Sequence, residues 1–160
     1  MSFAKLGLAH EIVNAVTEFG YTEPTAIQEQ AIPAILAGGD ILAGAQTGSG
    51  KTAAFTLPIL HMLSDKSVKG QSEGRPPIRA LILVPTRELA AQVEECIIDY
   101  GKHLKLTSMV MIGGVSINPQ IKALRSRVDI LVATPGRLLD HISQGTLSLS
   151  QVKTLILDEA

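Results

Sequence analysis

Short apolar runs alternate with longer amphipathic stretches along the chain. Five runs have the length and composition of buried strands: DILAG (40–44), RALILV (79–84), LTSMVMI (106–112), DILVAT (129–134) and TLILD (154–158). Nearly continuous hydrophobic strands are typical of a parallel sheet, because burial of both faces removes the alternation of polar and apolar positions. The pattern therefore predicts an α/β fold with a doubly wound, mostly parallel sheet and helices on both faces.

The clearest helical pattern is RELAAQVEECIIDYG, residues 87–101. Leu89, Val93 and Tyr100, together with Cys96 or Ile97, recur on one face at helical spacing, and Gly101 suits the end of the helix. The polar, Gly- and Pro-rich stretch at 64–77 is predicted to be a surface loop. A chain of 160 residues with these elements is expected to form one domain.

Polar, Gly-rich or charged residues follow each predicted strand directly. The segments are AGAQTGSGKT, VPTRE, IGGVS, ATPGR and LDEA. The carboxyl ends of parallel strands meet at one edge of the sheet, and ligands of open α/β sheets bind there. We therefore expect all five segments to collect at one edge and to form the functional site.

The segment AGAQTGSGKT has the character of a phosphate-binding loop. Gly48 and Gly50 allow backbone N–H groups to turn toward phosphate, and Lys51 opens a predicted helix. The Thr52 hydroxyl is expected to be offered to Mg²⁺. Ala45 stands where the strict pattern has glycine. The alternative is a flexible Gly/Ser loop followed by an unrelated Lys-Thr pair.

Two adjacent carboxylates, Asp158 and Glu159, end the last apolar run. A Mg²⁺-bound nucleoside triphosphate needs a carboxylate on the metal and a group that places the attacking water, and these two residues suit those roles. Lys51, Asp158 and Glu159 then form a minimal catalytic set for phosphoryl transfer to water. Without the phosphate loop, the alternative interpretation of Asp158 and Glu159 is a solvated turn or an acidic pair at the start of a helix.

In PTRE and TPGR a threonine precedes a predicted helix and an arginine follows closely, Arg87 or Arg137. Free N–H groups at a helix start together with an arginine form a phosphate site, and Gly113 and Gly114 follow a neighbouring strand. These segments together predict a track for a phosphodiester backbone. Helix capping alone also explains the threonines and Pro135, and the two glycines also fit a tight turn.

Composition narrows the class of partner. With 14 basic and 15 acidic residues the net charge is −1, so there is no global attraction to polyanions. Aromatic residues make up only 3% of the chain and tryptophan is absent, which argues against a base-stacking platform. Any nucleic acid is therefore expected to be recognised through its backbone, without sequence specificity.

The remaining candidate groups carry no predicted chemistry. His10, His61, His103 and His141 lack zinc-site spacing and are expected to be exposed or satisfied at the surface, and Cys96 to be a buried thiol. No apolar run approaches the length of a membrane span and no secretion signal is evident, so we expect a soluble, cytoplasmic protein that does not contact membranes.

These segments together resemble the N-terminal RecA-like domain of DEAD-box ATP-dependent RNA helicases. GYTEPTAIQ (20–28) resembles the Q motif, AQTGSGKT motif I, PTRELA motif Ia, TPGR motif Ib, and DEA the first letters of motif II, in family order. The stretch GGVSINPQIKALRSRVDILVATPGRLLD is most similar to the bacterial RhlE-like subgroup. The resemblance implies a partial N-terminal ATP-binding domain at 1–160 with its Q motif at 3–28, a chain truncated within the DEAD motif, and absence of the second RecA-like domain.

The resemblance also implies roles for particular residues. Gln28 recognises the adenine edge with help from Tyr21 or Thr25, and Phe3 packs on the base. ATP and Mg²⁺ are held by motif I and the DEAD motif, namely by Gln46, Thr47, Gly48, Ser49, Gly50, Lys51 and Thr52, with Asp158 as a metal ligand. RNA phosphates and sugars are contacted by Pro85, Thr86, Arg87, Gly113, Gly114, Thr134, Pro135, Gly136 and Arg137. From the residues alone, Gln28 reads as exposed and Phe3 as a terminal core anchor.

Two substitutions depart from the family pattern. Ala26 replaces a common proline and is expected to loosen the start of the Q-motif helix, and Arg127 stands where glycine is frequent and is strained if φ is positive there. In the family's sheet order, a further strand lies between the strand before the phosphate loop and TLILD, and its absence leaves a gap in the sheet.

The resemblance implies an RNA-stimulated ATPase that unwinds short RNA duplexes by clamping one strand. The 160 residues alone are expected to bind nucleotide weakly and not to unwind. A DNA-directed helicase or translocase of the same superfamily and a non-catalytic, nucleotide-gated RNA clamp remain as alternatives. The biological RNA target is not encoded in a backbone reader.

Overall fold

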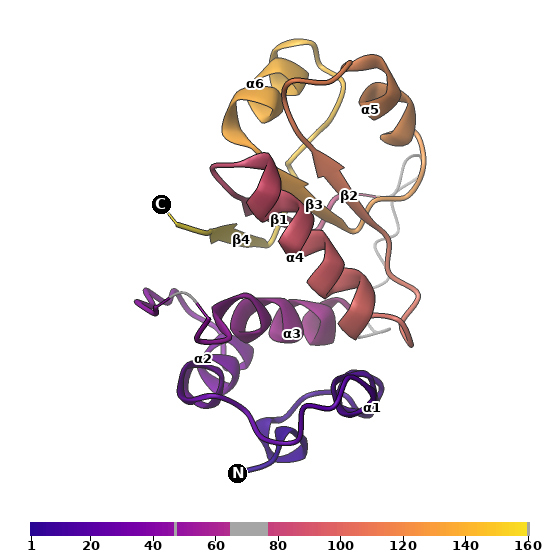
Figure 1. Cartoon of the computed structure of the whole chain (residues 1–160). Coiled ribbons are helices and arrows are strands. Elements are labelled where there is room, and N and C mark those ends of the chain that lie inside the picture. The colour runs from indigo at the N-terminus through magenta and orange to yellow at the C-terminus, as the bar shows by residue number, and fades with distance from the viewer. Residues whose placement is uncertain (47, 65–76, 160) are drawn as a thin grey trace. The chain divides into compact units, whose positions relative to one another are not determined.

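A computed structural model describes residues 1–46, 48–64 and 77–159. The described chain divides into two compact units (Figure 1). The first contains residues 1–46, 48–64 and 96–105, and the second contains residues 77–95 and 106–159. Every helix in the described part of the chain is too short or too polar to cross a membrane.

The first unit is helical. Its elements are the 3-10 helix η1 (Phe3–Leu6), α1 (His10–Glu18), α2 (Ala26–Leu36), α3 (Lys51–Ser64) and the last turn of α4 (Arg87–Tyr100). Its core includes Ile12, Ile32 and Leu60, which are fully buried. The predicted end of α4 is confirmed, since Gly101 follows its last residue.

The second unit contains the sheet. Its strands are β1 (Ala80–Leu83), β2 (Ser108–Met111), β3 (Ile130–Ala133) and β4 (Thr154–Leu157), and its helices are α5 (Asn118–Ala123), α6 (Pro135–Ser143) and the first part of α4. The strand order is β2-β3-β1-β4 and every pairing is parallel. The α/β class and the parallel sheet are therefore confirmed.

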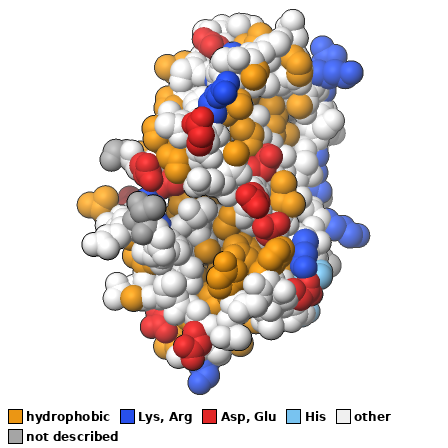
Figure 2. Space-filling view, in the orientation of Figure 1, with side chains coloured by type: hydrophobic (Ala, Val, Ile, Leu, Met, Phe, Trp, Pro, Cys, Tyr) orange, Lys and Arg blue, Asp and Glu red, His pale blue; other side chains and the backbone are white. Residues whose placement is uncertain are grey.

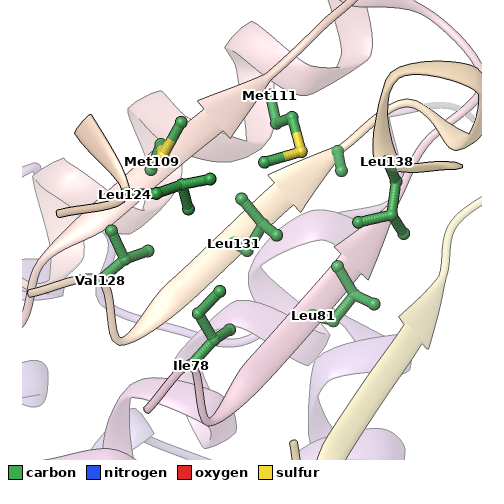
Figure 3. Packing of buried hydrophobic residues seen from close by; sticks show 9 residues of the cluster. Ile78, Leu81, Met109, Met111, Leu124, Val128, Leu131 and Leu138 are labelled. Atoms are coloured by element: carbon green, nitrogen blue, oxygen red, sulfur yellow. The ribbon is translucent and has the colours of Figure 1, made fainter. Parts of the chain in front are cut away.

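Both faces of the central strands β1 and β3 are buried, as the unbroken apolar runs predicted. One face contributes to a cluster with side chains from the α5 and α6 regions (Figure 3). Its members are Ile78, Leu81, Met109, Met111, Leu124, Val128, Leu131, Ala133 and Leu138. Ile82 and Ile130 alternate with these residues and are also fully buried.

Two strand predictions need correction. Residues 40–44 form no strand, and Leu42 is completely exposed. A strand requires a hydrogen-bonded neighbour, and no described strand pairs with this segment. TLILD does form β4 but is not buried, because β4 is an edge strand paired only with β1; Leu155 and Leu157 are more than half exposed.

The face of the molecule in Figure 2 agrees with the balanced composition. Acidic and basic side chains are interspersed among hydrophobic and uncharged ones in the view of Figure 2. Attraction to a polyanion must therefore come from the local arrangement of particular groups, which directs attention to the strand ends and the phosphate loop.

Candidate functional site

Gln28 joins the start of α2 to the phosphate loop within the first unit. Its Oε1 accepts a hydrogen bond from the backbone N–H of Thr25 at 3.0 Å, and its Nε2 donates to the Gly50 carbonyl at 3.1 Å. Thr25 and Gln28 occupy the two positions of a capping box, which supports a helix start at Ala26 without a proline. Gln28 is 7% exposed, so the interpretation of this residue as merely exposed is wrong.

The phosphate loop has the backbone that anion binding requires. Gly48 and Gly50 have φ of 81° and 84°, and Lys51 opens α3 as predicted. A side chain added at Gly48 would meet open space, whereas one at Gly50 would collide with Gln28. Ser49 Oγ is buried without a hydrogen-bond partner among the described residues, which fits a loop shaped to receive an acceptor group. Thr47 lies outside the described residues.

Two aromatic candidates differ in exposure. Phe3 is only 5% exposed, so it lies in the packed interior of the first unit, as the core-anchor interpretation held. Tyr21 is 55% exposed and meets the Tyr100 ring nearly edge-on, with the ring centroids 6.5 Å apart. Burial raises the pKa of Tyr100 to about 12, so its hydroxyl stays protonated at neutral pH. Tyr21 is thus available to a ligand in a way that Phe3 is not.

Four of the five strand-end segments meet at one edge of the sheet in the second unit. Leu83, Ala133 and Leu157 are at the same level of the sheet, and Met111 is paired with Ala133. Backbone hydrogen bonds continue one residue further, from Thr134 N to Met111 O and from Asp158 N to Leu83 O. The segments that follow β1, β2, β3 and β4 therefore start side by side. The fifth, the phosphate loop, belongs to the first unit, where no strand precedes it.

Arg87 and the Gly113–Gly114 turn lie together at this edge. Gly114 has φ of 75°, and a Cβ added there would come within 2.9 Å of Arg87 Nη1. Thr86 Oγ1 accepts a hydrogen bond from Leu89 N at 3.2 Å, so Thr86 caps α4 as the capping interpretation predicted. Pro85, Thr86 and Arg87 are all exposed and accessible to a ligand.

The TPGR segment begins α6. Thr134 is the N-cap in extended conformation and Pro135 takes the first position, but the Thr134 hydroxyl makes no capping hydrogen bond. A Cβ added at Gly136 would meet open space, so a ligand could approach the backbone closely there. Arg137, in contrast, is only 11% exposed: Nη1 donates to Gln120 Oε1 at 3.1 Å and Nη2 to the Val115 carbonyl at 2.8 Å.

The two carboxylates at the end of β4 differ in environment. Asp158 is 6% exposed and fixed by its backbone bond to Leu83, whereas Glu159 is exposed. Glu159 has φ of 56°, a left-handed backbone that non-glycine residues adopt at a cost of about 1–3 kcal/mol. Such strain is typical of functional positions and turns. Thr52, the other predicted Mg²⁺ ligand, belongs to the first unit.

Sequence reasoning missed two buried polar residues, Gln120 and His141, which are 8% and 0% exposed. The expectation of a surface role for His141 is therefore wrong, although its ring is satisfied: Nδ1 lies 2.7 Å from Thr146 Oγ1 and Nε2 lies 3.1 Å from Gln120 Oε1. Burial and the nearby Arg137 lower the pKa of His141. Cys96 is half-buried rather than buried.

The suspected strain at Arg127 is also absent. Among the described non-glycine residues only Glu159 has a positive φ. Arg127 Nε instead donates to Asp129 Oδ1 at 3.1 Å, and Asp129, 2% exposed, also accepts from Arg79 Nη2 and Thr107 N. This cluster stabilises the start of β3.

Comparison with known proteins gives consistent matches. The family model described as DEAD/DEAH box helicase matches residues 25–160. The chain is 49% identical over 160 residues to the ATP-dependent RNA helicase DeaD of Escherichia coli K12, covering 99% of this chain and 24% of that protein. It is 46% identical to the ATP-dependent RNA helicase CshA of Limosilactobacillus reuteri, covering 100% of this chain and 31% of the relative.

A solved structure agrees with this fold. The crystal structure of the RNA helicase Prp28 from Chaetomium thermophilum bound to ADP matches with a TM-score of 0.87 and 41% identity, covering 99% of this chain and 38% of that one. The chain thus spans about a quarter to two fifths of the proteins it matches. A further relative, RhpA of Helicobacter pylori, is 42% identical over 159 residues, with 99% of this chain and 30% of RhpA covered. These names do not single out the expected RhlE-like subgroup.

Proposed function

Because the chain belongs to the DEAD/DEAH box helicase family, we propose that it is the nucleotide- and RNA-binding part of an ATP-dependent RNA helicase, with a RecA-like domain as its framework. The observation that carries this proposal is Gln28, which is bonded both to its own helix start and to the phosphate loop. A side chain that reads a base is thereby connected to the segment that holds the phosphates.

The hydrogen-bond donor and acceptor that Gln28 leaves unused match the edge of adenine. Its amide offers two donors and two acceptor sites, and the bonds to Gly50 and Thr25 use one of each. One donor and one acceptor remain, which complement N7 and the 6-amino group of adenine, the same pairing that glutamine makes with adenine in nucleic acids. Guanine presents acceptors at both positions, so ATP is preferred over GTP. Tyr21 or Thr25 assists Gln28. The proposed packing of Phe3 on the base requires that this side chain, only 5% exposed, become accessible when nucleotide binds.

The phosphate loop and the carboxylates then supply the chemistry. Backbone groups of Gln46, Thr47, Gly48, Ser49 and Gly50 surround the phosphates, and Lys51 neutralises their charge. Thr52 and Asp158 each carry an oxygen donor of the kind that Mg²⁺ prefers and would hold the ion, which would offset charge on the phosphates. Glu159 orients the attacking water and takes its proton. The 160 residues alone bind nucleotide weakly and do not unwind RNA.

The RNA backbone is met at the strand-end edge of the second unit. Arg87, exposed beside Gly114, provides the positive charge, and the N-termini of α4 and α6 provide N–H groups. The track is completed by the exposed Pro85, Thr86, Pro135 and Gly136 and by the partly buried Gly113, Thr134 and Arg137. A local site of this kind suits a chain with no net positive charge.

The test is a titration with Mg·ATP and Mg·GTP of the unmodified chain and of Gln28→Ala, Lys51→Ala and Gln30→Ala. The exposed Gln30 on the same helix is the matched control. We expect a preference for ATP that Gln28→Ala abolishes and Gln30→Ala leaves intact, whereas Lys51→Ala weakens both nucleotides. The ratio of the two affinities is the readout, because loss of the Gly50 bond affects ATP and GTP alike. Equal binding of ATP and GTP by the unmodified chain would contradict adenine recognition.

The finer assignments of the proposal rest on sequence. We propose a cytoplasmic location, which suits a chain with one cysteine among its 160 residues. An RhlE-like subgroup remains a prediction from residues 113–140. Two measurements separate the alternatives. Hydrolysis of ATP that is stimulated by RNA and not by DNA indicates an RNA helicase rather than a DNA-directed enzyme. Binding of nucleotide and RNA without any hydrolysis indicates a binding clamp rather than an enzyme.

A further inference from the structure

The Gly113–Gly114 turn is held on both flanks by two largely buried side chains, Gln120 (8% exposed) and Arg137 (11% exposed). On one flank, Gln120 Nε2 donates to the Ile112 carbonyl at 2.9 Å. On the other, Arg137 Nη2 donates to the Val115 carbonyl at 2.8 Å. The residues directly before and after the two glycines are therefore each fixed through their carbonyl oxygen.

Gln120 and Arg137 are also hydrogen-bonded to each other. Arg137 Nη1 donates to Gln120 Oε1 at 3.1 Å. Because arginine only donates, this contact fixes the orientation of the Gln120 amide, with oxygen toward Arg137 and nitrogen toward the Ile112 carbonyl. The turn, Gln120 and Arg137 thus form one closed ring of contacts.

His141 completes the arrangement from the next turn of α6. Its Nε2 lies 3.1 Å from the same Gln120 oxygen and must donate to it, since an amide oxygen only accepts. In the neutral ring Nδ1 carries no proton and accepts from the Thr146 hydroxyl, 2.7 Å away; the single hydroxyl proton is then not donated to the His141 carbonyl, 3.1 Å from the same oxygen. His141 is fully buried and its pKa is lowered, which favours this neutral form.

We propose that Gln120 and His141 are positioning residues for RNA binding: they hold Arg137 and the Gly113–Gly114 turn in the arrangement that presents Gly114 and Arg87 to the RNA backbone. Neither side chain contacts RNA itself, since both are at least nine-tenths buried. The inference rests on the proposed RNA-binding function of this edge. It explains why three polar side chains, Gln120, Arg137 and His141, share the interior beside an apolar cluster, where each would be costly without its partners.

The test measures RNA and nucleotide binding by the whole chain in parallel. The RNA probe is a fluorescein-labelled ten-nucleotide oligouridine followed by anisotropy at low salt, and the nucleotide probe is a fluorescent ATP analogue. Gln120→Leu removes all of its polar contacts at similar volume. We expect RNA affinity to fall about tenfold, corresponding to about one buried hydrogen bond, with nucleotide affinity within about twofold of the unmodified chain.

Two control variants separate positioning from loss of stability. Gln92→Leu makes the same substitution at an exposed position of α4 and should change neither affinity. Val128→Ala destabilises the apolar cluster of the same unit without touching the polar ring, and should lower stability while leaving RNA affinity unchanged. If Gln120→Leu does not fold, Gln120→Glu carries the test, because it keeps the acceptor for Arg137 and His141 but removes the donor to Ile112.

The outcomes distinguish this inference from the function it rests on. Backbone amide signals of Gly113 and Gly114 in ¹⁵N–¹H NMR spectra should shift in Gln120→Leu and not in Gln92→Leu, which supports positioning directly. RNA binding by the unmodified chain together with equal binding by Gln120→Leu overturns the inference alone. Absence of RNA binding by the unmodified chain overturns the proposed RNA-binding edge as well.

Discussion

Gly50→Ala probes the link between the phosphate loop and the Q-motif helix. Gly50 has φ of 84°, and an added Cβ would collide with Gln28 Nε2 and come within 3.0 Å of Thr25 Oγ1. Gly38 has nearly the same φ, 86°, but an added Cβ meets nothing within 4 Å. Gly38→Ala therefore measures the backbone cost alone, and the difference between the two variants measures the collision.

The magnitudes follow from the contacts. An alanine in the left-handed region costs about 1–2 kcal/mol in either variant. In Gly50→Ala the displacement of Gln28 also breaks two hydrogen bonds. Loss of the bond to the Gly50 carbonyl costs about 1 kcal/mol, and loss of the bond to Thr25 that caps α2 costs about another 1 kcal/mol. We therefore expect Gly50→Ala to cost about 2 kcal/mol more than Gly38→Ala.

The assay is urea unfolding followed by far-ultraviolet circular dichroism. With a slope of about 2 kcal/mol per M, the urea midpoint of Gly50→Ala should lie about 1 M below that of Gly38→Ala. In a Gln28→Ala background most of this difference should vanish, because the colliding amide is gone. Equal midpoints for the two glycine variants, or a difference that persists without Gln28, would refute the reasoning.

Three further predictions concern the second unit. Asp129→Ala should destabilise the chain by on the order of 3 kcal/mol in urea unfolding, because it leaves the largely buried Arg79 without this carboxylate; a change below about 1 kcal/mol would contradict the role of the cluster. The lowered pKa of His141 means that the unfolded chain takes up the proton first as pH falls. The contribution of His141 is therefore complete above about pH 6.5 and is lost as pH falls from there through the folded-state pKa; urea midpoints at pH 8 and pH 5 should differ more in the unmodified chain than in His141→Gln. Arg87→Ala should weaken RNA binding and reduce the slope of log affinity against log salt by about one, at unchanged melting temperature; an unchanged slope would exclude a phosphate contact.

The strands show where local pattern suffices and where it does not. The runs at 79–84 and 129–134 became central strands because neighbours bond to them on both sides, so their unbroken apolar character was a reliable signal. DILAG has the same character at 40–44 but forms no strand. Strand formation depends on a partner distant in sequence, and the composition of the run does not report whether that partner is present.

The candidate site shows a similar division. The phosphate loop and the strand ends were found because glycine, lysine and carboxylate residues have few structural reasons to occur together after apolar runs. On α6, periodicity gives no reason to bury His141 rather than Leu139 or Ile142, yet both of these are exposed and His141 is not. The N-cap at Thr134 sets the rotation of the helix, and Gln120, 21 positions before His141, supplies its partner. Such pairings between residues distant in sequence are set by tertiary structure and cannot be predicted from the local sequence pattern.

The position of Gln28 limits which mutations the chain can tolerate. The side chain there must donate to one backbone group and accept from another, at a reach that asparagine lacks and without the charge of glutamate. Gln30, two residues along the same helix and exposed, meets no such demand. The two glutamines of this short helix therefore tolerate substitution differently. Gln30 can be replaced by many residues during evolution, whereas Gln28 is constrained because only glutamine makes both of its hydrogen bonds.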